Sequence, residues 1–214
     1  MHLSGALPLN AIEPLRARHS IGSFHPLQSF AEPRPPSSLG GIVVAVDATT
    51  ASLRRRLAGL ARALGARPKR VGDSQRMLYH AAAVFASNYV DVLLGQAVRL
   101  LQAAGWEEKE ATSGLLALTE GAIANVRKRG AVAALTGPVR RGDVDTVEGH
   151  LAALAKLAGS TSPRSGPPVV DLYRMLGLIA LEIAVEAGLE PAAAERMHRA
   201  LTDQAAATRR RRRA

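Results

Sequence analysis

The chain has 214 residues, of which 47% are hydrophobic, 21% charged and only 3% aromatic, and it contains no cysteine. This composition is typical of a globular protein with an alanine- and leucine-rich core, and it excludes disulfides and thiolate metal sites. The net charge of +10 raises nucleic acid as a partner, but Arg209–Arg213 supply half of that charge. A like-charged terminal run is typical of a disordered tail, and the other basic residues lack interleaved aromatics, so nucleic-acid binding is disfavoured.

The first 70 residues alternate short apolar runs with turn residues. "HLSGA" predicts the end of a strand that runs into a turn, and Asn10 can cap a short helix that continues through Arg18. "SIGSF" and "GIVVAVDA" predict strands, whereas "AEPRPPSSLGG" between them predicts a loop because it is rich in proline, serine and glycine.

Helices dominate from Thr50 onward. Thr49 or Thr50 caps the first of them and Gly65 ends it. "GSTSPRSGPP" predicts a linker between the fourth and fifth helices. The predicted helices are Leu53–Leu64, Ser74–Ala104, Glu107–Lys128, Asp145–Ala158, Val169–Ala187 and Pro191–Ala206.

The long helix Ser74–Ala104 is apolar on too many faces for a surface helix, so we expect burial within a bundle and across a subunit contact. Its central run, Met77–Val98, resembles a membrane span in length. The run carries polar residues such as Asp91 that are costly in lipid, so a helix buried in protein is the better interpretation. Met1–Leu9 lacks the pattern of a signal peptide, and we expect a cytoplasmic protein without membrane partners.

The predicted fold class is an α/β fragment, a partial Rossmann-like sheet over residues 1–70, followed by an all-α helical domain over residues 71–208. Residues 209–214 form the basic tail, and the chain is mostly helical overall. Two or three strands leave an edge and a face of a doubly wound sheet uncovered, so we expect a further segment in front of Met1.

Five motifs in order, "HLSGAL", "GSFHPLQSF", "GIVVAVDA", "LYHAAAVFASNY" and "LTGPVRRGD", resemble the C-terminal two thirds of a group of Rossmann-like proteins taken to be NADP-dependent oxidoreductases. The resemblance covers nearly all of residues 2–190. It implies distant kinship with pyrroline-5-carboxylate reductase, ketopantoate reductase and prephenate dehydrogenase. In that superfamily, a dinucleotide domain precedes a helical, dimer-forming domain like that of 6-phosphogluconate dehydrogenase.

The sequence departs from this family at the nucleotide site. Such proteins bind the cofactor pyrophosphate on a Gly-x-Gly-x-x-Gly turn, and the printed sequence contains no such turn. The resemblance therefore implies NADP as the cofactor of the complete protein, with weak or absent binding to this chain, which we expect to be truncated at its N-terminus. Ser4 and Gly5, at a strand end, are the residues expected near the nicotinamide.

His25 is the first candidate catalytic residue. Pro26 restricts the backbone before it to extended geometry, and ligands of open α/β sheets gather at the carboxyl ends of strands. A similar Gly-x-His-Pro-Met stretch in prephenate dehydrogenases implies a place beside the nicotinamide and substrate. Gln28 follows as a candidate substrate-binding residue. The competing interpretation is a histidine whose ring is satisfied in a tight turn.

His80 and Asn88 are the other candidate catalytic residues, since positions 80, 84 and 88 share one face of a helix. Relatives carry a Lys-x-x-x-Asn pair on the matching helix, where the lysine acts as an acid and the asparagine holds the substrate. Asn88 matches the asparagine, but Val84 occupies the lysine position, so His80 is the candidate replacement for proton transfer. Ser87, adjacent to this face, is a candidate substrate-binding residue. Both polar side chains could instead be satisfied within a bundle.

Gly137-Pro138 in "LTGPVRRGD" breaks the chain, and Asp143 can cap the next helix. Arg141 is a candidate for binding a substrate carboxylate or phosphate, with a solvated arginine as the competing interpretation. No His, Asp or Glu residues have metal-ligand spacing, and no metal is expected.

The sequence therefore predicts the substrate-binding and dimerisation portion of an NADP-dependent oxidoreductase, which transfers hydride to or from a C–O or C–N centre of a small molecule and forms a homodimer. The alternative is a non-catalytic helical dimerisation or interaction module.

Overall fold

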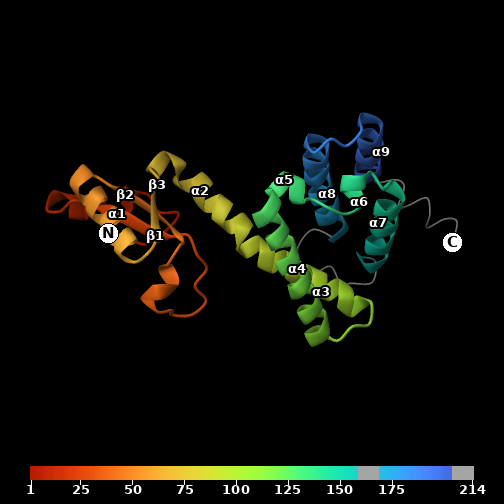
Figure 1. The fold of residues 1–214 in the computed structure, drawn as a ribbon, viewed down its shortest axis with the longest axis horizontal. Coiled ribbons are helices and arrows are strands. Elements are labelled where there is room, and N and C mark those ends of the chain that lie inside the picture. The colour runs from red at the N-terminus through yellow and green to blue at the C-terminus, as the bar shows by residue number, and fades with distance from the viewer. Residues whose placement is uncertain (159–168, 204–214) are drawn as a thin grey trace. The chain divides into compact units, whose positions relative to one another are not determined.

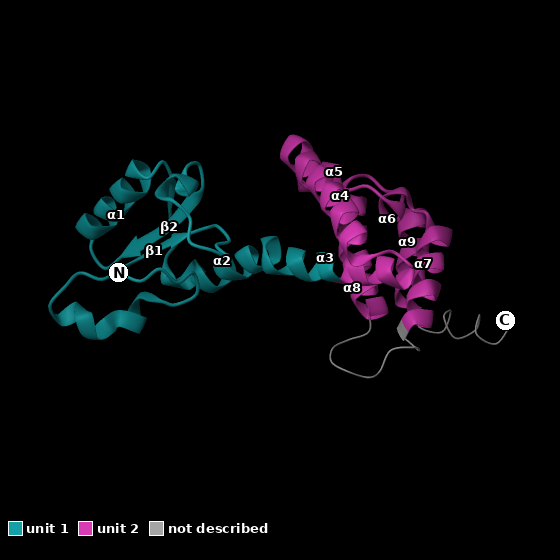
Figure 2. Cartoon of the chain, turned by 90° about the horizontal axis from the view of Figure 1, so that it is seen from below, with its two compact units in different colours: residues 1–95 teal, residues 96–214 magenta. Residues whose placement is uncertain are grey.

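The computed structural model describes residues 1–158 and 169–203 of the chain (Figure 1). Two compact units, residues 1–95 and 96–214, divide the chain (Figure 2). The linker predicted over residues 159–168 and the tail over 209–214 lie outside the described residues, as does the predicted end of the last helix at Ala206.

The first unit contains a three-stranded sheet in the order β1-β2-β3. β1 (Gly22–Pro26) pairs antiparallel with β2 (Val43–Ala48), and β2 pairs parallel with β3 (Arg67–Arg70). His2 adds a single parallel bridge to Ser23 on β1. The first two strands confirm the sequence prediction. No pattern predicted β3, because its sequence "RPKR" carries a proline and three basic residues, which are unfavourable for a strand.

One face of this sheet is apolar and is covered by α1 (Ala51–Ala63). Side chains alternate along a strand, so every second residue of β2 points toward this helix. Thr50 accepts a hydrogen bond from the Leu53 amide and caps α1, as predicted. The cluster consists of Phe24, Val44, Val46, Ala48, Leu57, Ala61 and Ala66.

The opposite face of the sheet is polar and buried. Ser23 and Asp47 lie opposite each other in the ladder, and both are almost fully buried. His25 follows two residues after Ser23 and therefore shares its face. The helix α2 (Asp73–Ala86) supplies side chains to this face, which positions the candidate site.

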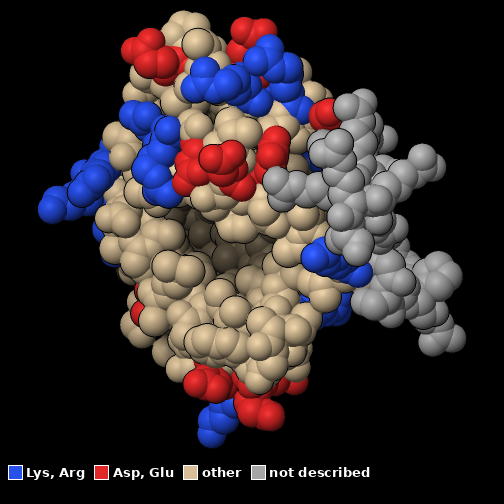
Figure 3. Space-filling model, turned by 90° about the vertical axis from the view of Figure 1, so that its right-hand side faces the viewer, with Lys and Arg blue, Asp and Glu red and all other residues tan. Residues whose placement is uncertain are grey.

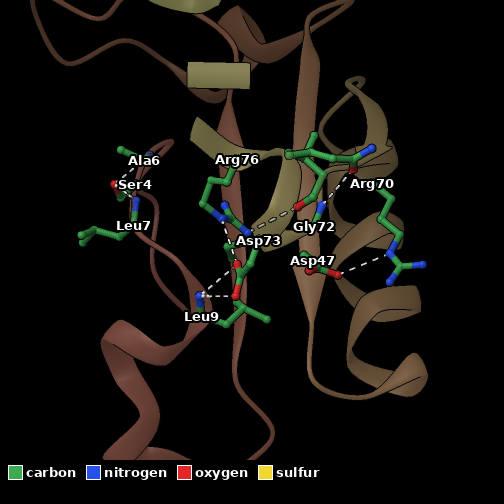
Figure 4. Close-up of polar contacts among 12 residues, drawn as sticks. Ser4, Ala6, Leu7, Leu9, Asp47, Arg70, Gly72, Asp73 and Arg76 are labelled. Carbon is green, nitrogen blue, oxygen red and sulfur yellow. Dashed lines mark hydrogen bonds and ion pairs between the residues drawn. The ribbon is translucent and has the colours of Figure 1, made fainter. Parts of the chain in front are cut away.

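The structure differs from two local predictions in the residues that precede β2. The 3-10 helix η1 (Leu9–Ala17) begins after Pro8, so Asn10 lies inside the helix and does not cap it. The carboxylate of Asp73 accepts the Leu9 amide and takes over the role of the cap (Figure 4). The predicted loop before β2 contains a further short 3-10 helix, η2 (Pro36–Leu39).

The long helix predicted over Ser74–Ala104 is interrupted. α2 ends at Ala86, Ser87 has φ −130° and ψ −77°, and α3 (Asn88–Ala103) follows. The expected burial of this stretch within the chain is also wrong, because its large apolar side chains are exposed. By length and composition alone, Asp73–Ala103 is apolar enough to cross a membrane, and none of its most apolar window is buried. The exposed side chains are Met77, Leu78, Phe85, Tyr89, Val92 and Leu93.

The second unit is helical, and its described helices match the four predicted there to within a few residues. Two short helices were not predicted, and both lie around the predicted break at Gly137-Pro138. The Asp143 side chain accepts the Thr146 amide, which confirms the predicted cap. The helices are α4 (Glu108–Arg129), α5 (Ala131–Ala134), α6 (Pro138–Arg141), α7 (Val144–Ala158), α8 (Val169–Glu186) and α9 (Pro191–Thr202).

The core of this unit lies between α6, α7, α8 and α9. α8 and α9 approach closely at Gly177, where an added β-carbon would lie 2.6 Å from Cδ2 of Leu201. The core residues are Val139, Val147, Leu151, Leu181, Met197 and Leu201. An α/β piece followed by a helical part is therefore the observed architecture, as the sequence predicts.

Candidate functional site

Three segments of the first unit bring Gly5, His25 and His80 together. A β-carbon added to Gly5 would lie 2.8 Å from Nε2 of His25 and 2.9 Å from Nδ1 of His80. The two imidazole rings are edge-to-face, with centroids 6.4 Å apart. Only glycine leaves room for both rings, so its place in "HLSGA" has a structural reason beyond the turn.

Tyr79 holds the other side of the His25 ring. Its hydroxyl lies 2.7 Å from Nδ1 of His25, and the two rings meet edge-to-face at 5.6 Å and 89°. Tyr79 and His80 are consecutive on α2, so the two residues flank His25 from one helix. Nδ1 of His25 therefore has a polar partner from another segment, and Nε2 lies on the side of the ring that packs against Gly5.

Arg76 lies one turn before these residues and is 1% exposed. Its Nε donates to Asp73 at 3.2 Å, and its Nη2 donates to the Ser23 hydroxyl at 2.9 Å (Figure 4). Its Nη1 is buried and has no hydrogen-bond partner among the described residues. A buried guanidinium with one carboxylate partner adds positive charge beneath the site.

This environment keeps the His25 ring neutral and the Tyr79 phenol protonated. Burial lowers the pKa of His25, and the nearby His80 and Arg76 lower it further. Burial raises the pKa of Tyr79, although Arg76 opposes that rise. A neutral imidazole next to a protonated phenol can donate or accept one proton near neutral pH, which is the chemistry of a general acid or base.

A further polar group on the same face is Asp47. Its Oδ1 lies 3.5 Å from Nε of Arg70, which is an ionic contact without hydrogen-bond geometry, so this oxygen counts as buried without a hydrogen bond. The carboxylate lies near the start of α2, since an added β-carbon at Gly72 would be 3.8 Å from its Oδ2. A carboxylate at a helix N-terminus is favourably placed.

Two of the predicted site residues are engaged in local turns. The Ser4 hydroxyl accepts the amides of Ala6 and Leu7, which fixes the turn that carries Gly5 (Figure 4). Gln28 is exposed, and its side-chain oxygen accepts the amide of Ser29. Their contacts in this structure are those of turn-forming residues.

The structure does not bring the remaining predicted residues to the His25 ring. Ser87 is the residue at which the helix breaks, and Asn88 is exposed at the start of α3. The break removes the regular helical spacing between His80 and Asn88 on which their shared face was predicted. Arg141 belongs to the second unit, is exposed and lies 3.8 Å from Asp143.

Sequence reasoning missed Tyr79 and Arg76, which make the closest contacts of the site. Arg76, Tyr79 and His80 are spaced i, i+3 and i+4, so they share one face of α2. An arginine one turn before a tyrosine and a histidine on the same helix face was the available signal.

Other features of the described residues lie apart from this cluster. No group of three or more His, Asp or Glu side chains comes together as a metal site within residues 1–158 and 169–203. A shallow groove of about 600 Å³ belongs to the second unit, whereas the His25 cluster belongs to the first. It contains no imidazole and is lined by Trp106, Glu107, Lys109, Glu110, Ser113 and Gly114.

Comparisons with known proteins agree with this architecture. The model of a family described as "Domain of unknown function (DUF2520)" matches residues 42–180. No curated protein matches the chain.

Two solved structures are similar over most of the chain, each at 25% sequence identity. One is BF3122 from Bacteroides fragilis, described as a "putative NADP oxidoreductase", with a TM-score of 0.68 over 85% of this chain and 64% of that chain. The other is protein TM1727 from Thermotoga maritima, with a TM-score of 0.71 over 87% of this chain and 68% of that chain. The chain thus spans less than two thirds of the length of the Bacteroides protein.

Proposed function

Since the chain belongs to the DUF2520 family and its fold is similar to that of a protein described as a "putative NADP oxidoreductase", we propose that it is the substrate-binding and dimerisation portion of an NADP-dependent oxidoreductase. The observation that carries this proposal is the meeting of His25 and His80 at Gly5. The proposed reaction moves a hydride to or from a C–O or C–N centre of a small molecule.

The residues present fit the nicotinamide end of NADP better than its pyrophosphate. Nδ1 of His80 is buried without a hydrogen-bond partner among the described residues, and a carboxamide or substrate oxygen could provide one. The printed sequence has no Gly-x-Gly-x-x-Gly turn for the pyrophosphate. When bound, the nicotinamide would supply or accept the hydride.

The chain's own contribution is proton transfer and orientation. His25 is held from two sides, by Tyr79 at Nδ1 and by the packing at Gly5, so its ring has a fixed direction. A fixed, neutral imidazole is suited to move one proton at the substrate oxygen or nitrogen, with His80 as its neighbour. Asn88 and Arg141 remain candidates for holding the substrate in the assembled protein.

Exposed apolar side chains support the dimerisation part of the proposal. In the first unit they follow α2 and α3, and in the second unit they lie mainly on α4 and α8, including Leu118 and Met175. The side drawn in Figure 3 shows an area without Lys, Arg, Asp or Glu, with charged side chains above and below it. Soluble monomers rarely leave such surfaces uncovered, and a second copy of the chain is the proposed partner.

The same exposed surface favours the alternative function, a non-catalytic helical interaction module. The two candidates differ in what they require of His25, because an interaction module needs no mobile proton. The cytoplasmic location expected from the sequence belongs to both proposals.

The deciding experiment compares reduced nicotinamide mononucleotide with NADPH as hydride donors to a panel of small carbonyl and imine compounds. The mononucleotide lacks the adenosine half, so the absent glycine turn should matter little for it. We expect slow reduction that His25→Ala lowers by about 100-fold, in the range for loss of a general acid or base. The exposed His19→Ala is the matched control and should keep the activity. No turnover with either donor would favour the interaction module, and turnover that does not depend on His25 would contradict the proton-transfer role proposed for His25.

A further inference from the structure

The hydrogen bond between Tyr79 and His25 has a direction that the chemistry of its two groups decides. Its length of 2.7 Å is short for a bond donated by a ring N–H and normal for one donated by a hydroxyl. Burial raises the pKa of Tyr79, so its phenol keeps the proton that it would donate. The neutral His25 ring has one nitrogen with a lone pair to accept it.

We infer that Tyr79 is a positioning residue, which donates its hydroxyl proton to Nδ1 of His25 and so holds the ring in the tautomer that carries a proton on Nε2. The ring nitrogen that carries the proton is set by the hydrogen bond that the other nitrogen makes. This inference rests on the proposed function, in which His25 moves a proton. It adds that the resting His25 ring is prepared to donate a proton from Nε2.

The Nε2 proton lies on the side of the His25 ring that faces Gly5. Nε2 is the His25 atom next to Gly5, and Nδ1 of His80 borders the same point. His25 thus offers a proton donor at the place where two segments meet. A resting donor suits the reduction of a carbonyl or imine better than the oxidation of an alcohol or amine.

The proton balance of that reduction is complete with water as the final source. The hydride forms the new C–H bond, and the π electron pair of the C=O or C=N group moves to its oxygen or nitrogen. That atom takes the proton of Nε2 while the Tyr79 proton moves to Nδ1, so the ring stays neutral. Nδ1 then returns this proton to the Tyr79 oxygen, and water supplies a new proton to Nε2 and leaves as hydroxide, which restores the resting tautomer. The buried Arg76 favours the transient phenolate.

The ionisable groups that face His25 come from α2, namely Tyr79, His80 and Arg76. β2 presents Ala45 directly opposite His25, with Asp47 two residues further along the same face, and the N-terminal segment presents Gly5 and pairs His2 with Ser23. Because tyrosine and phenylalanine are both uncharged, Tyr79→Phe removes the hydrogen bond to His25 and leaves the charges around the ring as they are.

The second unit supplies a matched control. The Tyr173 hydroxyl lies 2.8 Å from Nδ1 of His150, and their rings meet edge-to-face at 5.7 Å and 89°. This pair repeats the geometry of Tyr79 and His25, but His150 is exposed. Tyr173→Phe removes the same kind of hydrogen bond outside the candidate site.

The test is nitrogen NMR of the imidazole rings in the full chain labelled with ¹⁵N-histidine, which distinguishes the two neutral tautomers directly. We expect His25 to carry its proton on Nε2, and Tyr79→Phe to mix the two tautomers while the phenyl ring keeps its packing. Tyr173→Phe should change only the signals of His150. A His25 ring protonated on Nδ1, or one whose tautomer ignores Tyr79→Phe, overturns the inference.

A second measurement separates this inference from the proposed function. With reduced nicotinamide mononucleotide as donor, Tyr79→Phe should lower reduction by about threefold to tenfold, the size of one neutral hydrogen bond, and should shift the pH profile. Tyr173→Phe should leave both unchanged. If the NMR result holds without any turnover, the tautomer stands and the enzymatic function fails. Turnover that Tyr79→Phe leaves unaltered in rate and pH profile overturns the positioning role alone.

Discussion

Arg76 donates a hydrogen bond to Ser23 across 53 positions of the chain, and so joins helix α2 to strand β1. Both side chains are about 1% exposed, so the guanidinium is held in a site where water does not compete for its hydrogen bonds. The same helix carries Tyr79 and His80 one turn later. The Arg76–Ser23 contact therefore sets the position of the residues that flank His25.

Replacing Arg76 should destabilise the chain more than replacing an arginine in a shorter but exposed ion pair. Arg76→Met leaves the buried Ser23 hydroxyl and the Val71 carbonyl without their donor, at a cost of about 1–3 kcal/mol. Arg199→Met breaks the 2.6 Å contact between Arg199 and Glu195, whose side chains are 62% and 71% exposed. That pair should contribute less than about 1 kcal/mol. Urea denaturation of both variants measures the difference, and equal losses would contradict it.

Gly5→Ala should separate the two imidazoles. The new methyl group would lie within 2.9 Å of both rings, so the rings or the turn must move, at a cost of about 1–3 kcal/mol. Gly72→Ala is the control, since its methyl group would meet its nearest neighbour at an ordinary 3.8 Å. Thermal unfolding gives the cost, and nuclear Overhauser contacts between His25 and His80 report their separation. Unchanged contacts in Gly5→Ala would contradict the close packing.

The lowered pKa of His25 should make the chain less stable in mild acid. The unfolded ring, with a pKa of about 6.5, binds a proton more readily than the folded ring, so unfolding takes up a proton in this range. The stabilisation is present above about pH 6.5 and is lost as the pH falls toward the folded pKa. Denaturant titrations of His25→Gln should show a smaller decrease over this window than the original chain. Part of the decrease in stability should remain in His25→Gln, because the pKa of His2 is also lowered, mainly by burial.

A charge on the exposed face of α2 should disrupt the proposed dimer. Leu78 is 79% exposed in the single chain, so Leu78→Glu should leave the fold intact and give a monomer in light scattering at micromolar concentration. Leu15→Glu is the control, because Leu15 is 52% exposed on η1, away from that helix in the sequence, and should remain dimeric. A monomeric original chain would contradict the proposed partner.

Local sequence signals specified those elements whose preferences agree with their packing. "GIVVAVDA" is a strand because alternate valines meet α1, and Thr50 and Gly65 bound that helix by capping and by a positive φ of 75°. Three predicted site residues lie together: Gly5, His25 and His80. Turn and strand signals predicted the elements that carry Gly5 and His25, and a helix signal predicted the element that carries His80.

The contacts between these segments could not be predicted from local signals, because they form only in the folded chain. β3 forms from "RPKR" because an adjacent strand offers it a ladder, which outweighs a poor local propensity. Asn10 loses its predicted role because the distant Asp73 accepts the Leu9 amide in its place. The partner of His25 is Tyr79, 54 positions away, and no local pattern contains such a distance. Hydrogen bonds and burial between remote segments depend on the folded geometry, so the chemistry of the site was settled only when the sheet and α2 came together.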